Sequence, residues 1–378
     1  MWLLFLLVAL TAYADELPAG HIIDGVKCLS DPSQAYALYL PASYSPARTW
    51  PVIFAFDPAA RGRIPVERYQ AAAETYGYIV AGSNNSRNGS WEVSTRAAQA
   101  MMTDVGARFG VDLTRVYAAG MSGGARVALG IALGSNLIAG VIASSGGYPD
   151  GKLRKTLPFA MFATAGTEDF NYLELRTLDR ELTSPHRLAI FEGGHVWLSS
   201  ELATEAVEWM EIGAMKSGRK PRDQSQIDAI YSKRLGAAYS MKQSKDAFLA
   251  LEALVKDFTG LKDVSEPSAR AAALDRDKQV RDALKKDRDE ENRERRQTDE
   301  LLAAENQLSS SDGRPMALAH LHGRWKKLAA AANGPADSAD RRIARRMLRG
   351  LSAGVTERTK DEEYIKIVGE FRPPRTPR

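Results

Sequence analysis

The segment Gly120-Met121-Ser122-Gly123-Gly124 places one serine between glycines two residues away on either side. A serine hydroxyl is a weak nucleophile, so an enzyme must hold it on a sharp turn that a substrate and a base can both reach. A β-rich run precedes the segment at 115–119, and a helical pattern follows at 125–133. We therefore predict a strand, a turn and a helix with Ser122 as nucleophile, rather than a glycine-rich turn of structural use alone.

The acid that would orient a histidine is expected after a later strand. Residues 159–165 have the pattern of a buried strand and lead into Glu168 and Asp169. Asp169 fits the strand end better than Glu168, so we predict it as the acid of a triad. Asp169 could instead cap the helix predicted from 171, and Glu168 or Asp150 are the alternative acids.

The base is expected after one more strand, and His195 follows the strand predicted over 188–192 on a loop with two glycines. His21 lies before the fold, and His186 precedes its strand, at the wrong end of the sheet. We therefore predict His195 as the base. Two further histidines lie in a helical part with a spacing that puts them on different faces: His320 and His322.

Short strand patterns alternate with helical patterns between about 21 and 197, which predicts a mostly parallel sheet flanked by helices. Residues 22–26 and 35–40 predict an antiparallel hairpin at the start. The other strands are predicted at 51–56, 78–81, 116–120, 139–144, 159–165 and 188–192, and the helices between them at 66–76, 96–109 and 126–133.

Residues 21–213 resemble an α/β-hydrolase of the dienelactone-hydrolase, feruloyl-esterase and polyhydroxybutyrate-depolymerase kind. The resemblance is carried by the segments around Ser122, Asp169 and His195. It implies a serine hydrolase that cleaves a small or polymer-attached carboxylic ester through an acyl-enzyme, without a cofactor or a metal ion. A serine peptidase is an alternative within the same class.

The chain departs from these relatives after the strand at 51–56, where they have a glycine-rich segment that helps to stabilise an oxyanion. Pro58 stands there and has no N–H to donate. Asp57 and Arg61 could pair and brace this loop. A catalytically weak binding or scaffold protein on the hydrolase fold is therefore a second hypothesis. The candidate oxyanion donors are the backbone N–H groups of Gly123 and of Ala59 or Ala60.

The chain has 378 residues, 44% of them hydrophobic and 26% charged, which is enough for two domains. A short apolar run at 1–14 ends in Ala-Tyr-Ala and predicts a cleavable signal peptide, hence a secreted or periplasmic protein without stable membrane insertion. We place an α/β-hydrolase domain at 15–216, a helical accessory region at 221–352 and a poorly ordered tail at 353–378. Cys28 is the single cysteine, so no internal disulfide can form.

Basic and acidic residues alternate in the second half of the chain, and this pattern predicts a solvated helix surface. The net charge of +4 therefore does not indicate a nucleic-acid partner. Residues 268–308 could form one helix, but 275–300 is nearly all charged and predicts an exposed or partly disordered stretch. One tetratricopeptide-like hairpin, at 224–258, could serve a protein partner or self-association. Too few residues separate 144 from 159 for a lid insertion. Four loop aromatics could stack on a substrate or pack the rim: Trp91, Tyr148, Tyr172 and Trp197.

Overall fold

A computed structural model describes residues 17–335 and 337–372. Its centre is an eight-stranded sheet with the order β1-β2-β4-β3-β5-β6-β7-β8. The strand β2 pairs antiparallel with β1 and β4, and the remaining pairs are parallel. The predicted hairpin and all predicted strands are confirmed. The strands are β1 (Ile22–Lys27), β2 (Ala35–Tyr39), β3 (Trp50–Phe56), β4 (Ile79–Ser83), β5 (Val111–Met121), β6 (Ile138–Ser144), β7 (Ala160–Gly166) and β8 (His186–Phe191).

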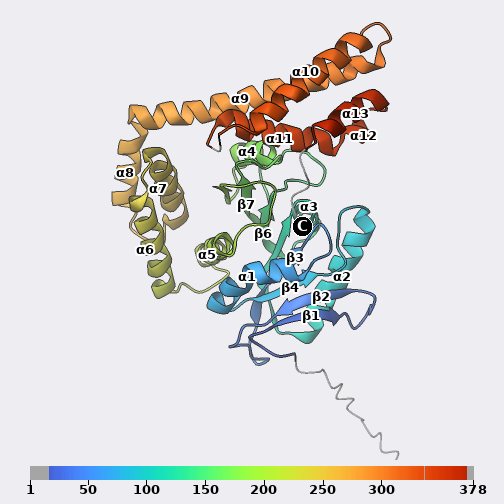
Figure 1. Cartoon of the computed structure of the whole chain (residues 1–378). Coiled ribbons are helices and arrows are strands. Elements are labelled where there is room, and N and C mark those ends of the chain that lie inside the picture. The colour runs from blue at the N-terminus through green and yellow to red at the C-terminus, as the bar shows by residue number, and fades with distance from the viewer. Residues whose placement is uncertain (1–16, 336, 373–378) are drawn as a thin grey trace, which may run out of the picture.

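Helices cover both faces of this sheet (Figure 1). Apolar residues of α2, α3 and α4 pack on one face, and those of α1 and α5 pack on the other. The central strands are therefore buried on both sides, as expected for a parallel sheet. The chain has an α/β-hydrolase fold followed by an all-α region, which confirms the predicted fold class. The helices are α1 (Arg63–Tyr76), α2 (Trp91–Arg108), α3 (Gly123–Leu133), α4 (Tyr172–Glu181) and α5 (Ser200–Lys216).

The rest of the described chain, 224–372, is helical and is called the helical region below. The stretch 268–308 is two helices rather than one, because Asp277 caps a new helix by accepting a hydrogen bond from the Gln279 N–H at 2.7 Å. Its helices are α6 (Gln224–Ser240), α7 (Ser244–Phe258), α8 (Ser265–Asp275), α9 (Lys278–Asn306), the short 3₁₀ helix η1 (Gln307–Ser309), α10 (Arg314–Ala332), α11 (Ala339–Ala353), α12 (Val355–Arg358) and α13 (Glu362–Glu370).

The tail predicted to be poorly ordered contains α12 and α13 in its described part, so that prediction is wrong for residues 355–370. Tyr364 and Val368 of α13 are buried in the core of the helical region. The Tyr364 hydroxyl accepts a hydrogen bond from Trp325 Nε1 at 3.1 Å. Two apolar anchors one turn apart are a weak signal in a sequence, but they are enough to fix a short helix on a formed core.

Apolar side chains join the helical region to the sheet region (17–216). Ile212 and Met215 of α5 share one buried cluster with Ile227 of α6 and with Leu254 and Phe258 of α7. The boundary predicted near 216–221 is a turn between α5 and α6, and packing continues across it. Hydrophobic burial therefore ties the first two accessory helices to the sheet region.

Ion pairs tie α9 to the sheet region at a second place. Glu291 of α9 is buried and accepts hydrogen bonds from Arg176 and Arg180 of α4. Glu294, one turn later, is buried against Arg346 of α11, whose Nε lies 2.9 Å from its Oε2. The charged stretch is therefore a helix, and its buried carboxylates Glu291 and Glu294 pair with arginines of other elements. Figure 1 shows α9 and α11 lying over α4.

None of the helices in residues 17–335 and 337–372 combines the length and apolar character needed to cross a membrane. The predicted signal peptide at 1–14 lies outside the described residues, as do residues 373–378 of the predicted tail.

Replacing Arg346 by Met should destabilise the protein by about 3–5 kcal/mol, because Glu294 is left buried without its partner. Burial already raises the pKa of Glu294, and loss of the guanidinium should raise it further. A carboxyl group with a higher pKa in the folded state than in the unfolded state binds its proton more tightly when the protein is folded. The free energy of unfolding therefore falls as the pH rises past these pKa values. The deficit relative to the unmodified protein, measured by urea denaturation, should therefore be larger at pH 8 than at pH 5.

The matched control is Lys278→Ala, which removes an exposed pair with Asp282 and should change the free energy of unfolding by no more than about 1 kcal/mol. Equal effects of the two substitutions would contradict a docked α9.

Candidate active site

The turn between β5 and α3 holds Ser122 in a backbone conformation that non-glycine residues rarely adopt, with φ 56° and ψ −120°. Gly120 and Gly124 make the turn sterically possible. A Cβ on Gly120 would lie 2.1 Å from the Gly124 carbonyl oxygen, and one on Gly124 would lie 1.9 Å from the Phe56 carbonyl oxygen. The serine thus stands where the central strand ends and the helix begins, as predicted.

The structure brings the three predicted triad residues together. Ser122 Oγ lies 2.8 Å from His195 Nε2, and His195 Nδ1 lies 2.8 Å from Asp169 Oδ1. The side chain of Asp169 is fully buried, whereas Ser122 and His195 are half-buried and accessible. A buried carboxylate on Nδ1 fixes the tautomer that leaves Nε2 free to accept a proton.

Neighbouring residues hold the imidazole and its acid. The ring of Phe170 stacks on the His195 ring, with centroids 4.0 Å apart. Asp169 Oδ1 also accepts a hydrogen bond from the Asn171 N–H at 2.9 Å. The Ser145 hydroxyl donates to the carbonyl oxygen of Val196, which follows the histidine. The loops that carry Asp169 and His195 are therefore each held by more than one contact.

Helix α11 holds the loop that carries the acid. Glu168 binds Arg341 and Arg345, with the Arg345 pair at 2.8 Å, and Arg346 donates to the Thr167 carbonyl oxygen. Glu168 was the alternative acid, but its carboxylate faces these arginines rather than His195. The helical region thus contacts the two residues that immediately precede Asp169.

The loop after β3 differs from the sequence-based expectation. The Ala59 N–H donates to Asp57 Oδ1 at 2.8 Å, and the Ala60 N–H donates to the Asp57 carbonyl oxygen at 3.3 Å. The prediction of Ala59 or Ala60 as an oxyanion donor is therefore wrong for this structure, because both N–H groups are engaged. Gly123 is the first residue of α3, and no acceptor within the described residues takes its N–H.

Asp57 explains the shape of this loop. Its fully buried carboxylate accepts hydrogen bonds from Ala59, from Arg61 at 2.9 and 3.0 Å, and from Trp197 Nε1 at 2.8 Å. The predicted pairing of Asp57 with Arg61 is confirmed. Because Trp197 lies two residues beyond His195, the same carboxylate links the β3 loop to the loop of the base.

The other residues predicted as site candidates lie away from Ser122, Asp169 and His195, or they are buried in the protein. Asp150 pairs with Arg154 at 2.8 Å on the surface. Tyr148 and Trp197 are buried, and Arg346 stacks over the Tyr172 ring, so Trp91 is the one of the four predicted aromatics that is exposed. The other four histidines lie outside the triad: His21, His186, His320 and His322.

Two residues beside the triad were not predicted from the sequence. Phe170 follows Asp169, and its position next to the acid could have suggested a contact with His195. Asn88 lies on the loop after β4, and its amide Oδ1 is 1.8 Å from the position that a Cβ of Gly123 would occupy. No motif marks Asn88, but it follows a parallel strand at the carboxyl edge of the sheet, where sites gather.

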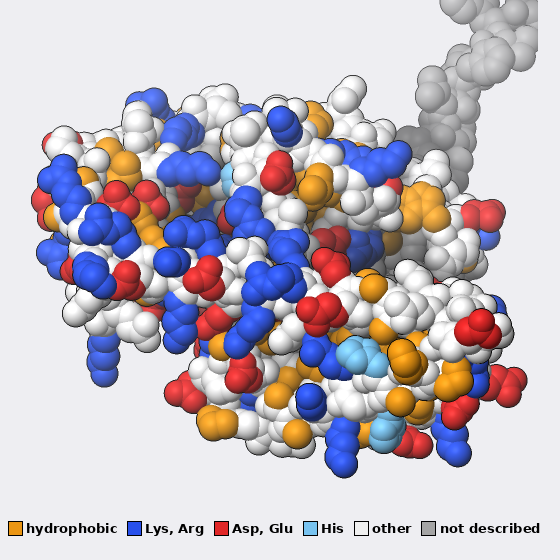
Figure 2. All heavy atoms as spheres, turned by 90° about the horizontal axis from the view of Figure 1, so that it is seen from above, with side chains coloured by type: hydrophobic (Ala, Val, Ile, Leu, Met, Phe, Trp, Pro, Cys, Tyr) orange, Lys and Arg blue, Asp and Glu red, His pale blue; other side chains and the backbone are white. Residues whose placement is uncertain are grey.

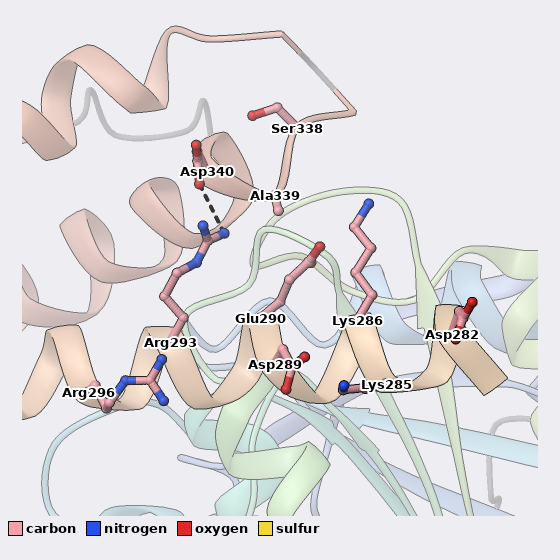
Figure 3. Close-up of a pocket in the computed structure, with 10 residues that line it drawn as sticks. All are labelled: Asp282, Lys285, Lys286, Asp289, Glu290, Arg293, Arg296, Ser338, Ala339 and Asp340. Atoms are coloured by element: carbon pink, nitrogen blue, oxygen red, sulfur yellow. Dashed lines mark ion pairs between the residues drawn. The ribbon is translucent and has the colours of Figure 1, made fainter.

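Within the described part of the chain, no group of three or more His, Cys, Asp and Glu side chains is arranged to hold a metal ion. A groove between α9 and the start of α11 is lined by charges of both signs, and Arg293 pairs with Asp340 at 2.9 Å across it (Figure 3). Basic and acidic side chains are likewise mixed over the face formed by the helical region (Figure 2). The groove is lined by Lys285, Lys286, Arg293 and Arg296 against Asp282, Asp289, Glu290 and Asp340.

The sequence matches no family model and no curated protein. Among solved structures, esterase 2 of Thermogutta terrifontis phosphonylated by sarin aligns at 16% identity with a TM-score of 0.42, covering 56% of this chain and 99% of that one. The S-formylglutathione hydrolase of Staphylococcus aureus aligns at 15% identity and a TM-score of 0.38, covering 47% and 90%. An esterase of Pyrobaculum calidifontis aligns at 11% identity with a TM-score of 0.41, covering 53% of this chain and 87% of that one. The assignment of the fold class rests on the strand order of the sheet and on the helices that cover its two faces.

Replacing Asp57 by Ala should destabilise the protein by about 3–5 kcal/mol, because Arg61, the Ala59 N–H and the Trp197 indole would lose a shared buried acceptor. Thermal and urea unfolding measure the loss. Arg61→Ala is the control, since it removes one partner that is 37% exposed and should cost clearly less. Equal losses would show that the carboxylate does not organise the loop.

Proposed function

We propose that this protein is a serine hydrolase that cleaves carboxylic esters. The observation that supports it most is the hydrogen-bonded chain from Ser122 through His195 to Asp169, with distances of 2.8 Å at both links. A serine on a strained turn, a base within hydrogen-bonding reach and a buried acid on that base form the arrangement required for acyl transfer.

In the first half of the reaction, Ser122 Oγ attacks the ester carbonyl carbon and His195 Nε2 takes its proton. A carbon–oxygen bond forms, and the carbonyl π electrons move to the oxygen, which becomes an oxyanion. The buried Asp169 carboxylate stabilises the imidazolium that forms. The electron pair of the oxyanion then re-forms the carbonyl as the bond from the carbon to the alcohol oxygen breaks. His195 gives its proton to that oxygen, the alcohol leaves, and the acyl group remains on Ser122.

In the second half, water takes the place of the alcohol. His195 accepts a proton from the water as it attacks the acyl-enzyme, and returns it to Ser122 Oγ when the acid leaves. No cofactor takes part in this scheme. The Gly123 N–H stands at the helix N-terminus next to the nucleophile and is the donor we assign to the oxyanion.

The substrate class is a small or polymer-attached ester. Strand β6 ends at Ser144 and β7 begins at Ala160, so the connection is short and carries no lid domain. A serine peptidase would use the same triad, and comparison of ester with amide turnover separates the two activities.

The binding or scaffold alternative draws on one observation, the engagement of the Ala59 N–H by Asp57. A hydrolase left with one oxyanion donor would lose about a hundredfold or more in rate. Rapid reaction of Ser122 with a fluorophosphonate would count against a purely binding role. Export through the signal sequence at 1–14, and a partner or self-association through the helical region, are further proposals that come from the sequence.

Replacing Ser122 by Ala should reduce hydrolysis of p-nitrophenyl butyrate by at least about 10³-fold, because it removes the hydroxyl that lies on His195 Nε2. Circular dichroism and the melting temperature should stay close to those of the unmodified protein. Ser268→Ala, an exposed serine on α8, is the matched control and should keep full activity. Turnover that survives Ser122→Ala would place the activity elsewhere.

A further inference from the structure

The loop after β4 contains three asparagines whose side chains have different roles. Asn84 Oδ1 accepts a hydrogen bond from the Gly62 N–H at 3.1 Å. Asn85 accepts one from the Ala35 N–H at 2.8 Å and donates to the Ser33 carbonyl oxygen at 3.2 Å. The Asn88 amide makes no hydrogen bond to any described residue. Two of the three thus serve the fold, and the third is free.

The backbone around Asn88 is anchored to the loop that fails to supply an oxyanion donor. The Asn88 N–H donates to the Pro58 carbonyl oxygen at 2.9 Å, and Ala59 forms an isolated antiparallel bridge with Arg87. The loops after β3 and β4 therefore lie together, beside the end of β5 that bears the nucleophile. The hydrogen bond to Pro58 fixes the backbone position from which the Asn88 side chain extends.

The amide of Asn88 lies directly over Gly123. Its Oδ1 is 1.8 Å and its Cγ 2.9 Å from the position of a Cβ on Gly123. The Asn88 Nδ2 is 3.5 Å from the same position. A Cβ lies about 2.5 Å from the nitrogen of its own residue, so the position of Oδ1, which Nδ2 takes after a half-turn of the amide, is no more than about 4.3 Å from the Gly123 nitrogen. Two donors that each approach one oxygen at about 2.7–3.1 Å can be separated by this distance.

We propose that Asn88 is a second oxyanion donor, which acts through its side-chain Nδ2 together with the Gly123 N–H. This inference rests on the proposed function. As Ser122 Oγ bonds to the carbonyl carbon, the electron pair moves to the carbonyl oxygen, and both donors hydrogen-bond that oxygen. The oxygen and nitrogen of an asparagine amide exchange places by a half-turn about Cβ–Cγ, and the negative oxygen selects the orientation that presents Nδ2.

The assignment also explains two features of the sequence. Glycine at position 123 leaves room for the Asn88 amide in this position, because a Cβ there would force the amide to move away. The loop after β3 can have Pro58 and an engaged Ala59 N–H, because the second donor comes from the neighbouring loop. The Asn88 side chain thus replaces the Ala59 N–H as the second oxyanion donor.

The test compares Asn88→Leu and Asn88→Asp, which keep the size of the side chain and remove its donor, with Arg87→Leu as control. Arg87 is exposed on the same loop. On p-nitrophenyl butyrate, both Asn88 variants should lose about 10²–10³ in kcat, with KM within about threefold and an unchanged melting temperature. The control should keep its kcat.

A trifluoromethyl ketone, which forms a tetrahedral oxyanion with the serine, supplies the second readout. Its affinity should fall in the Asn88 variants by a factor similar to that of kcat/KM. The inference is overturned if kcat stays within threefold, or if kcat falls without loss of ketone affinity. Failure of the proposed function looks different, since the unmodified protein would then show no turnover that depends on Ser122.

Discussion

The backbone conformation of Ser122 is the constraint on which the site depends. A non-glycine residue with φ 56° and ψ −120° carries a strain of about 1–3 kcal/mol, and surrounding structure must maintain it. The central strand β5 supplies that structure through parallel pairing on both sides. The Ser122 N–H donates to the Ser144 carbonyl oxygen at 2.8 Å, and Gly120 packs so closely on Gly124 that a Cβ at either position would clash with backbone. Ser122 is therefore positioned by the buried centre of the sheet.

Charged groups help to hold the loops around this turn, in addition to apolar contacts such as that of Phe170 with His195. Asp57 connects the loop after β3 with Trp197, close to the base. Glu168, next to the acid, pairs with arginines of α11, and Arg346 reaches from α11 to the Thr167 carbonyl oxygen and to Glu294 of α9. The helical region is thus part of the framework of the acid loop, and a change in α9 or α11 has a direct physical route to the triad.

Local patterns in the sequence predicted the sheet and the grouping of Ser122, Asp169 and His195, because strand periodicity and the order of serine, acid and histidine can be read from the sequence. The Ala59 donor was predicted wrongly because the direction of the Asp57 carboxylate is set in part by Trp197, 140 residues further along the chain. The docking of α9 was not predicted, since Glu291 finds Arg176 across 115 residues and a charged run gives no apolar signal. Asn88 belongs to no motif, and only its position over Gly123 distinguishes it from Asn84 and Asn85.

The most direct test of the account is reaction of the purified protein with a fluorophosphonate, followed by peptide mass mapping. We predict a stoichiometric adduct on the peptide that contains Ser122, with much slower labelling in Asp169→Asn, because that change removes the carboxylate that fixes the histidine tautomer. No adduct, or an adduct spread over several serines at the rate of an unactivated hydroxyl, would contradict the claim that Ser122 is an activated nucleophile.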